Sequence, residues 1–275
     1  MQELLAELSS ALKVKEGVAA KRVHRLRTTI RRIDSLVNFV QPELREKQRS
    51  ALDELAALRK RAGKVRDIDA QIALLPEIAN GSTATDRRTV QERLVKKRKE
   101  YAAKLAAEAH AFTRSKLFAQ VKDIGRKILD ADNADNDPLR DAEARIAKLR
   151  VHFDPGSRIK PRRLHSLRVE VKSIRYLAEI SEAATERDQL LERLKSVQDA
   201  IGSWHDWERL TRTAKKTFRE RNSCPLLQEM RALLAARHSA AASETTHFFS
   251  SSETSSSRKP PQTSRRPMAL AQRAG

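Results

Sequence analysis

The residues that most often interrupt helices are scarce in this chain. It has 7 Gly and 9 Pro among 275 residues, whereas an all-β sandwich or barrel needs turn residues about every 8 to 12 positions. This scarcity excludes those folds and favours an all-α protein. Cysteine is scarcer still, because Cys224 stands alone. It can form neither an internal disulfide nor a multi-cysteine metal site, and an unpaired thiol suits the reducing cytoplasm.

Long apolar runs are also missing. No window approaches the roughly 18 consecutive apolar residues of a membrane-spanning helix. The chain opens with an acidic segment from Gln2 to Glu7, instead of the basic and then apolar residues of a secretory signal. We therefore expect a cytoplasmic protein that is not secreted and does not insert into a membrane.

Positive charge, in contrast, is abundant. The chain carries 56 Lys and Arg against 36 Asp and Glu, which gives a formal net charge of +20. Such an excess predicts a polyanionic partner. From composition alone this partner is a nucleic acid, an anionic membrane surface or a phosphate polymer.

Apolar residues recur at helical spacing along most of the chain. One such stripe consists of Val23, Leu26, Ile30, Ile33 and Val37. Turn residues divide the pattern into about ten helices. The predicted breaks are Gly17, Gln41-Pro42, Gly63, Pro76, Asn80 to Ser82, Asn133 to Pro138, Asp154 to Gly156 and Gly202.

Two segments stand out by composition. Residues 84–120 contain no Gly or Pro and predict one long helix, whose basic run from Arg93 to Lys99 we interpret as a solvated face.

Residues 241–275 are rich in Ser, Thr and Pro, with basic residues interspersed. Segments of this kind bury too little apolar surface to offset the entropy of ordering. We therefore expect a folded domain over residues 1–240 and a disordered basic tail over 241–275.

The most informative feature is an internal repeat. Val23 to Ile33 aligns with Leu164 to Ile174 at an offset of 141, and both copies read apolar-His-x-Leu-Arg-x-x-apolar-Arg/Lys-x-Ile. Gly63 to Ile68 aligns with Gly202 to Trp207 at an offset of 139. One unit therefore occurs twice, over about residues 1–125 and 138–240, which predicts two related helical bundles.

The matched basic residues share one side of each predicted helix. At about 100° per residue, the face formed by His24, Arg27 and Arg31 lies roughly 110° from the centre of the apolar stripe. Long basic side chains at such an edge can pack their stems and leave their charged heads free. The second copy repeats the pattern with His165, Arg168 and Lys172. We expect the two basic helices to face each other and to form a channel for a linear anion.

The second matched segment carries an acid in each copy. Asp67 follows Arg66, and Asp206 follows His205. Because aspartate is a favoured N-cap, we interpret both residues as caps of the next helices.

Taken together, these motifs resemble the CHAD domain family, the conserved histidine α-helical domains, over about residues 3–238. His24 to Arg32 is similar to the family's first histidine motif, and Lys60 to Asp69 to the Arg-Asp turn that follows it. His165 to Tyr176 and Val197 to Asp206 are similar to the second pair. The resemblance implies two antiparallel four-helix bundles related by a pseudo-twofold axis.

The resemblance also implies a ligand, inorganic polyphosphate, and a location in the cytoplasm or on polyphosphate granules. The residues implied to bind it are Lys21, His24, Arg27, Arg31, Arg32, Arg162, His165, Arg168, Lys172 and Arg175. Asp34 and Ser173 depart from the family pattern, since each stands where a further cation is common. Lys21, Arg162 and Arg163 can compensate for them.

Such a ligand offers only charged oxygens, so its recognition rests on charge and hydrogen bonding. Histidine becomes cationic more readily beside an anion. We therefore expect affinity to rise as the pH falls towards 6 and to depend steeply on salt.

Catalytic signatures are missing from the sequence. It contains no Gly-rich phosphate loop, no Glu-x-Glu-x-Lys motif of the CYTH triphosphatases and no His or Cys cluster with metal-ligand spacing. We expect a non-catalytic binder or scaffold that needs neither cofactor nor metal. The alternatives are a nonspecific nucleic-acid-binding helical protein, although 4% aromatic residues leave few stacking platforms, and a phosphohydrolase that uses His24 or His165. The sequence specifies no oligomeric state.

Overall fold

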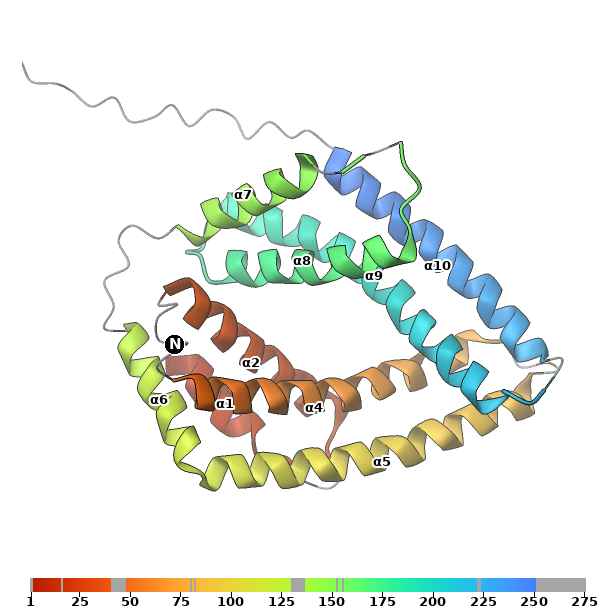
Figure 1. The fold of residues 1–275 in the computed structure, drawn as a ribbon, viewed down its shortest axis with the longest axis horizontal. Helices are drawn as coiled ribbons and strands as arrows, with labels where there is room; N and C mark the ends of the chain where they lie inside the picture. The colour runs from red at the N-terminus through yellow and green to blue at the C-terminus, as the bar shows by residue number, and fades with distance from the viewer. Residues whose placement is uncertain are drawn as a thin grey trace, which may run out of the picture.

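The computed structural model describes residues 2–15, 17–40, 48–79, 81, 83–129, 137–151, 153, 154, 156–221 and 224–250. These residues form nine α-helices, one short 3-10 helix and no strand (Figure 1). The expected all-α class is confirmed. Within the same ranges, no helix is both long enough and apolar enough to cross a membrane.

The first half of the chain contains α1, α2, α4, η1, α5 and α6. Their bounds are Gln2–Ala11, Ala20–Val40, Arg49–Leu74, Leu75–Glu77, Ala84–Arg114 and Lys116–Leu129. The second half contains α7, α8, α9 and α10, with bounds Pro138–Val151, Pro161–Glu179, Thr185–Thr217 and Pro225–Ser250. Helix α2 packs on α1 and α4, and α4 on α5, while α8 packs on α7 and α9, and α9 on α10. The order of neighbouring helices thus repeats.

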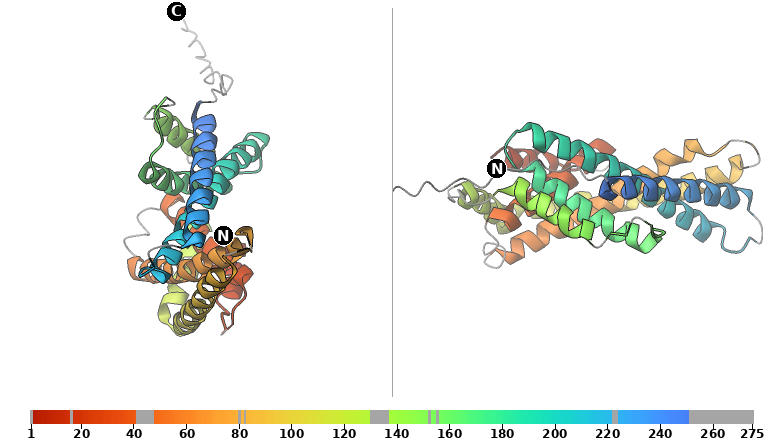
Figure 2. Two further views of the ribbon diagram at one scale, coloured as in Figure 1. Left: turned by 90° about the vertical axis from the view of Figure 1, so that its right-hand side faces the viewer. Right: turned by 90° about the horizontal axis from the view of Figure 1, so that it is seen from above.

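The halves meet through equivalent helices. Helix α2 packs on α8, and α4 packs on α9. Figure 1 and the left-hand view of Figure 2 show α5 and α6 on one side of this contact and α7 on the other. The two helices that carry the repeated histidine motif are therefore neighbours in space.

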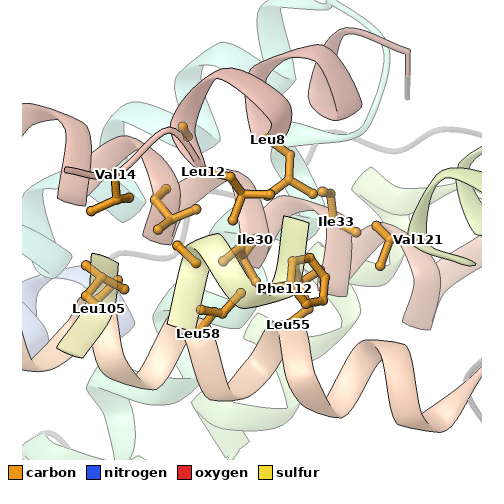
Figure 3. Packing of buried hydrophobic residues seen from close by; sticks show 14 of the residues in the cluster. Leu8, Leu12, Val14, Ile30, Ile33, Leu55, Leu58, Leu105, Phe112 and Val121 are labelled. Carbon is orange, nitrogen blue, oxygen red and sulfur yellow. The ribbon is translucent and has the colours of Figure 1, made fainter. Parts of the chain in front are cut away.

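Buried apolar residues form three clusters. One lies in the first half, where Leu8 of α1, Ile30 of α2, Leu58 of α4 and Leu105 of α5 pack together (Figure 3). A second lies among α7, α8, α9 and the end of α10. The third is shared, because it joins the end of α4 and the start of α5 to the end of α9 and the start of α10. The long helices therefore connect the two halves through a common core.

The apolar stripe predicted on α2 is confirmed. Its five members are at most 1% exposed: Val23, Leu26, Ile30, Ile33 and Val37. Burial of this stripe fixes the rotation of α2 and leaves the basic residues beside it at the edge of the core. This edge faces α8 and positions the candidate site.

Two of the predicted breaks are wrong. Gly63 lies inside α4, and Gly202 lies inside α9. Glycine costs a helix about 1 kcal/mol relative to alanine, which the burial of apolar residues on both sides of each glycine outweighs. By contrast, Gly17 has a left-handed φ of 78° before α2, and α4 ends at Leu74 just before Pro76. The predicted break at Gln41-Pro42 lies outside the described residues.

The single helix expected over residues 84–120 is also corrected. Helix α5 ends at Arg114, and α6 begins at Lys116. Between them, the backbone nitrogen and the hydroxyl of Ser115 both donate to the carbonyl of Phe112, at 3.1 and 2.8 Å. A serine side chain that competes in this way for a backbone acceptor favours the end of a helix.

The first ten residues of the expected tail are helical. Helix α10 continues through residues 241–250 to Ser250. Ala241, Phe248 and Phe249 are at most 4% exposed, and the rings of Phe153 and Phe249 lie 5.0 Å apart. The Ser- and Thr-rich composition of this segment did not indicate that Phe248 and Phe249 would be buried against the core. Residues 251–275 of the expected tail lie outside the described residues.

Candidate functional site

Five cationic side chains come together where α2 and α8 pack on each other beside α4. They are Arg27 and Arg31 of α2, Arg66 of α4, and Arg168 and Lys172 of α8, and we call them the central basic cluster. Each is half-buried. Burial, together with the charges of neighbouring cluster members, lowers the pKa values of Arg27, Arg168 and Lys172. The expectation that the two basic helices face each other is met by this packing.

Arg27 lies over the glycine of α4. Its Nε is 3.7 Å from the position that a Cβ on Gly63 would occupy. Burial and the nearby Arg31 lower the pKa of Arg27 to about 10. Its guanidinium therefore stays charged at neutral pH even though part of it is removed from water.

Lys172 is the most perturbed cation of the central basic cluster. Burial, together with the guanidiniums of Arg168, Arg27, Arg31 and Arg66, lowers its pKa to about 6. At pH 7 most of the free protein therefore carries a neutral amine at this position. A bound anion would favour the charged form, so binding is coupled to uptake of a proton.

Two carboxylates connect α4 and α9 beside the central basic cluster. Arg66 donates from Nη1 to both carboxylate oxygens of Asp206, at 3.0 and 3.1 Å. Arg209 of α9 pairs with Asp67 of α4 at 3.0 Å. Both aspartates lie inside long helices, so our interpretation of them as N-caps is wrong. They form cross-helix ion pairs instead.

These carboxylates leave part of the cluster uncompensated. Arg31 Nε and Arg168 Nε are shielded from solvent and have no hydrogen-bond partner. Buried charged donors without partners are costly, whereas anionic oxygens bound by guanidinium groups form strong hydrogen bonds. The arrangement therefore favours an anion with several oxygens.

The histidines flank the central basic cluster. His24 is exposed, and burial together with Arg66 and Arg27 lowers its pKa. His165 is also exposed, and its ring lies 5.2 Å from that of His205. His205 is only 4% exposed, and burial lowers its pKa although Asp206 opposes the shift. Neither His24 nor His205 thus gains charge readily in the free protein.

The other predicted site residues lie outside the cluster. Arg32 pairs with Glu179 at 3.4 Å and with Glu7 at 4.0 Å. Arg175 binds Glu179 at 2.5 Å and Gln198 at 2.9 Å. Lys21 and Arg162 are exposed in the first turns of α2 and α8. The structure thus groups four of the predicted cations with Arg66 and directs Arg32 and Arg175 towards carboxylates.

Arg66 and Arg209 were not among the predicted site residues. A signal for Arg66 was present, because the apolar positions Leu58, Ala62 and Val65 continue one helical stripe past Gly63. A helix that continues there places Arg66 beside the core and excludes capping by Asp67.

The two departures from the family motif lie together. Asp34 of α2 and Ser173 of α8 line one cavity of about 750 Å³, which Asp137, Arg140, Asp141 and Arg145 also line. Acidic side chains offset the basic ones there. The family's usual cations at both positions would have extended the basic surface into this region.

The geometry can be compared with known proteins. The CHAD domain family model matches residues 1–215 of the chain, well over half of its 275 residues. The chain belongs to the CHAD domain family. The match includes every member of the central basic cluster, and α10 lies beyond it.

A solved structure with a similar fold is PptA from Streptomyces chartreusis. Its TM-score is 0.61 at 16% sequence identity, and the similarity covers 90% of this chain and 94% of that chain. At this identity the likeness concerns the fold alone. A search of curated proteins gave no match. The assignment to the CHAD family therefore rests on the family model, and the solved structure supports its helical fold.

No group of three or more His, Cys, Asp or Glu side chains within the described ranges is arranged to hold a metal ion. The chemistry available at the central basic cluster is that of charge and hydrogen-bond donation.

Proposed function

We propose that this CHAD protein binds inorganic polyphosphate at the central basic cluster and does not cleave it. The observation that carries the proposal is the packing of α2 on α8 beside α4. This packing gathers four arginines and Lys172, and the described carboxylates that act on Arg168 there are Asp206 and Asp67. A linear polyanion supplies the missing negative charge along the contact between the two halves.

The cations are suited to phosphate oxygens in different ways. Arg27, Arg31 and Arg168 each offer a planar fork that can bind two oxygens, whereas a lysine offers a point charge. In the proposed complex Lys172 takes up a proton and neutralises one more phosphate. His24 and His165, both exposed at the edge, donate to the chain where it enters and leaves.

The proposed complex uses both halves of the chain. The two repeat halves, about residues 1–125 and 138–240, form two antiparallel four-helix bundles, made of α1, α2, α4 and α5 and of α7, α8, α9 and α10, with α6 as an additional helix on the first. The polymer runs through a basic channel between α2 and α8. The protein acts as a scaffold on polyphosphate granules in the cytoplasm. The repeated order of helix neighbours supports the division into two units, and the basic edges of α2 and α8 support the path of the channel.

The test is a competition titration of the purified chain with labelled long-chain polyphosphate against DNA and RNA, at matched charge concentration and physiological salt. We expect polyphosphate to bind at least tenfold more tightly, which corresponds to about 1.4 kcal/mol. The site variant is His24→Ala, Arg27→Ala, His165→Ala, Arg168→Ala, and it should lose this advantage.

A matched control removes two histidines and two cations elsewhere. His110, His247, Lys104 and Lys195 are exposed on α5, α9 and α10. Their combined substitution by alanine should leave the preference for polyphosphate intact. If nucleic acid competes equally, or if the site and control variants behave alike, net charge alone governs binding and the proposal is wrong. Release of phosphate from polyphosphate with added Mg²⁺ would contradict the absence of cleavage.

A further inference from the structure

A second basic region lies where α4, α5 and α9 meet. A cavity of about 280 Å³ there is lined by the cations Lys64, Arg93, Lys97, Arg209, Arg212 and Lys216. We call it the α5 pocket. Among its described lining residues Asp67 is the single carboxylate. The volume is close to the lower limit of small-molecule sites, about 300 Å³.

The positive charge of the α5 pocket is only partly compensated. Arg209 pairs with Asp67 at 3.0 Å, and Arg212 pairs with Glu208 at 2.8 Å. Within the described part of the chain, Arg93, Lys97 and Lys216 form no ion pair. Like charges gathered around one hollow repel each other, so the pocket favours an anion.

The floor of the α5 pocket is built from packed residues. Gln71 is 5% exposed and accepts a hydrogen bond of 2.7 Å from the hydroxyl of Thr213, which joins α4 to α9. The ring of Tyr101 lies 5.9 Å from Lys64 Nζ and 5.6 Å from Lys97 Nζ. Cation–π contacts of this kind hold the two ammonium groups near the pocket wall.

The basic run on α5 is therefore not a uniform solvated face. Lys96 and Lys99 are exposed and do not line the pocket, whereas Arg93 and Lys97 do. Arg98 binds Asp69 and donates to the carbonyl of Val18 at 2.8 Å. The run thus divides between solvent, an ion pair within the fold and the α5 pocket.

We propose that the α5 pocket is a second binding site for condensed phosphate, an inference that rests on the proposed function of the central basic cluster. A chain of polar groups links the two regions. Arg66 of the cluster lies 3.8 Å from Asp67, and Asp67 lies 3.0 Å from Arg209 of the pocket. A phosphate chain that leaves the cluster meets these cations next. A separate short phosphate chain has the same chemistry and fits the same pocket.

The test compares two triple variants with equal loss of charge. The pocket variant is Arg93→Ser, Lys97→Ser, Lys216→Ser, and the control variant is Lys96→Ser, Lys99→Ser, Lys215→Ser. Each changes two exposed residues of α5 and one of α9. Isothermal titration at physiological salt measures the binding of tripolyphosphate and of long-chain polyphosphate to each full-length protein.

We expect at least one of two differences between the variants. If the pocket takes a separate short chain, the unaltered protein and the control bind two tripolyphosphates, and the pocket variant binds one. If it takes a segment of the polymer, long-chain affinity falls at least fivefold further in the pocket variant than in the control. Equal behaviour of both variants with both probes would overturn the inference.

A third variant separates this inference from the proposed function. Arg27→Gln, Arg168→Gln changes the central basic cluster and leaves the α5 pocket intact. Suppose that this variant no longer binds long-chain polyphosphate, while the pocket and control variants bind both probes equally well. The second site is then refuted, and the proposed function stands. If this variant binds the long chain normally while the pocket variant does not, the polymer binds at the α5 pocket and the function proposed for the cluster is wrong.

Discussion

The two halves of the chain place different chemistry at equivalent positions in and beside the central basic cluster. Arg27 and Arg168 correspond to each other, but Arg31 corresponds to Lys172 and Arg66 to His205. A guanidinium stays charged at every physiological pH, whereas an amine or an imidazole titrates when its surroundings shift it. The first half is therefore permanently cationic, and the second half can change its charge.

The charges of the first half contribute to the lowered pKa of Lys172 in the second half. After burial and Arg168, the groups that lower the pKa of Lys172 are Arg27, Arg31 and Arg66, all from the first half. The fixed charges of the first half therefore add to burial and Arg168 in favouring the neutral amine of Lys172. The free protein thereby avoids one buried charge, and an arriving anion restores it.

The largest expected effect compares the halves directly at pH 8. Arg27→Gln, Arg31→Gln should weaken polyphosphate binding about 100-fold, because each lost charge-assisted hydrogen bond is worth about 1.5 kcal/mol. Arg168→Gln, Lys172→Gln should weaken it only about tenfold, since the unaltered protein must first protonate Lys172. Titration with labelled polyphosphate at constant salt measures both losses.

The difference in affinity between the two double variants should not come from a loss of stability. Both pairs of substitutions remove cations that repel each other, so neither should lower the midpoint of thermal unfolding. Equal losses of affinity in the two pairs at pH 8 would show that the halves are equivalent and would refute the comparison.

The acids of the two halves should also differ in their effect on stability. Asp206→Asn should lower the free energy of unfolding by about 2 kcal/mol at pH 7, less than the about 3 to 5 kcal/mol of a fully buried pair, because the side chain of Arg66 is 29% exposed. Asp67→Asn should cost about 1 kcal/mol, since its partner Arg209 is 40% exposed. Urea unfolding at pH 7 measures both values.

The pH dependence gives a second check on Asp206. Burial alone would raise the pKa of this carboxyl, but His205 and Arg66 outweigh burial and lower it. Its stabilising effect is therefore present above the ordinary aspartate pKa of about 3.9 and disappears as the pH falls through the lowered value in the folded state. The difference in unfolding free energy between the unaltered protein and Asp206→Asn should therefore become smaller in acid. A difference that stays constant with pH would mean that the ion pair is not its source.

A smaller effect concerns pH and binding. Polyphosphate affinity should rise about tenfold from pH 8 to pH 6 as Lys172 charges in the free protein. Lys172→Met should remove most of this rise, whereas Lys148→Met, at an exposed position of α7, should preserve it. Titrations in two buffers of different ionisation enthalpy measure the proton taken up on binding. Uptake that persists in Lys172→Met would assign the proton to another group, such as His24.

This comparison also shows what the sequence could and could not predict. The apolar stripe of α2 and the repeat predicted the helical class and the packing of α2 on α8, because both patterns can be read directly from the residues. The pKa of Lys172 depends on Arg66, which reaches it from another helix, so no local pattern contained it. The prediction at Gly63 was wrong because the glycine was taken as the end of a helix. In the structure α4 continues through it, and the glycine only lowers the local helix stability.

The smallest effects test this last point. Because Gly63 and Gly202 lie inside helices, Gly63→Ala and Gly202→Ala should each stabilise the fold by about 0.5 to 1 kcal/mol. An added Cβ at Gly202 meets nothing within 4 Å, and at Gly63 it meets only Arg27 Nε at 3.7 Å, an ordinary contact. Gly17→Ala should instead destabilise by about 1 kcal/mol, because its φ of 78° disfavours any side chain.

Larger side chains should then distinguish the two helical glycines. Gly202→Leu should leave polyphosphate binding unchanged, whereas Gly63→Leu should push Arg27 away from α4 and weaken binding several-fold while the protein stays folded. Chemical unfolding together with the polyphosphate titration measures both effects. If Gly63→Leu binds as well as Gly202→Leu, the position of Arg27 over α4 has no part in binding, and the glycine of the first half serves packing alone.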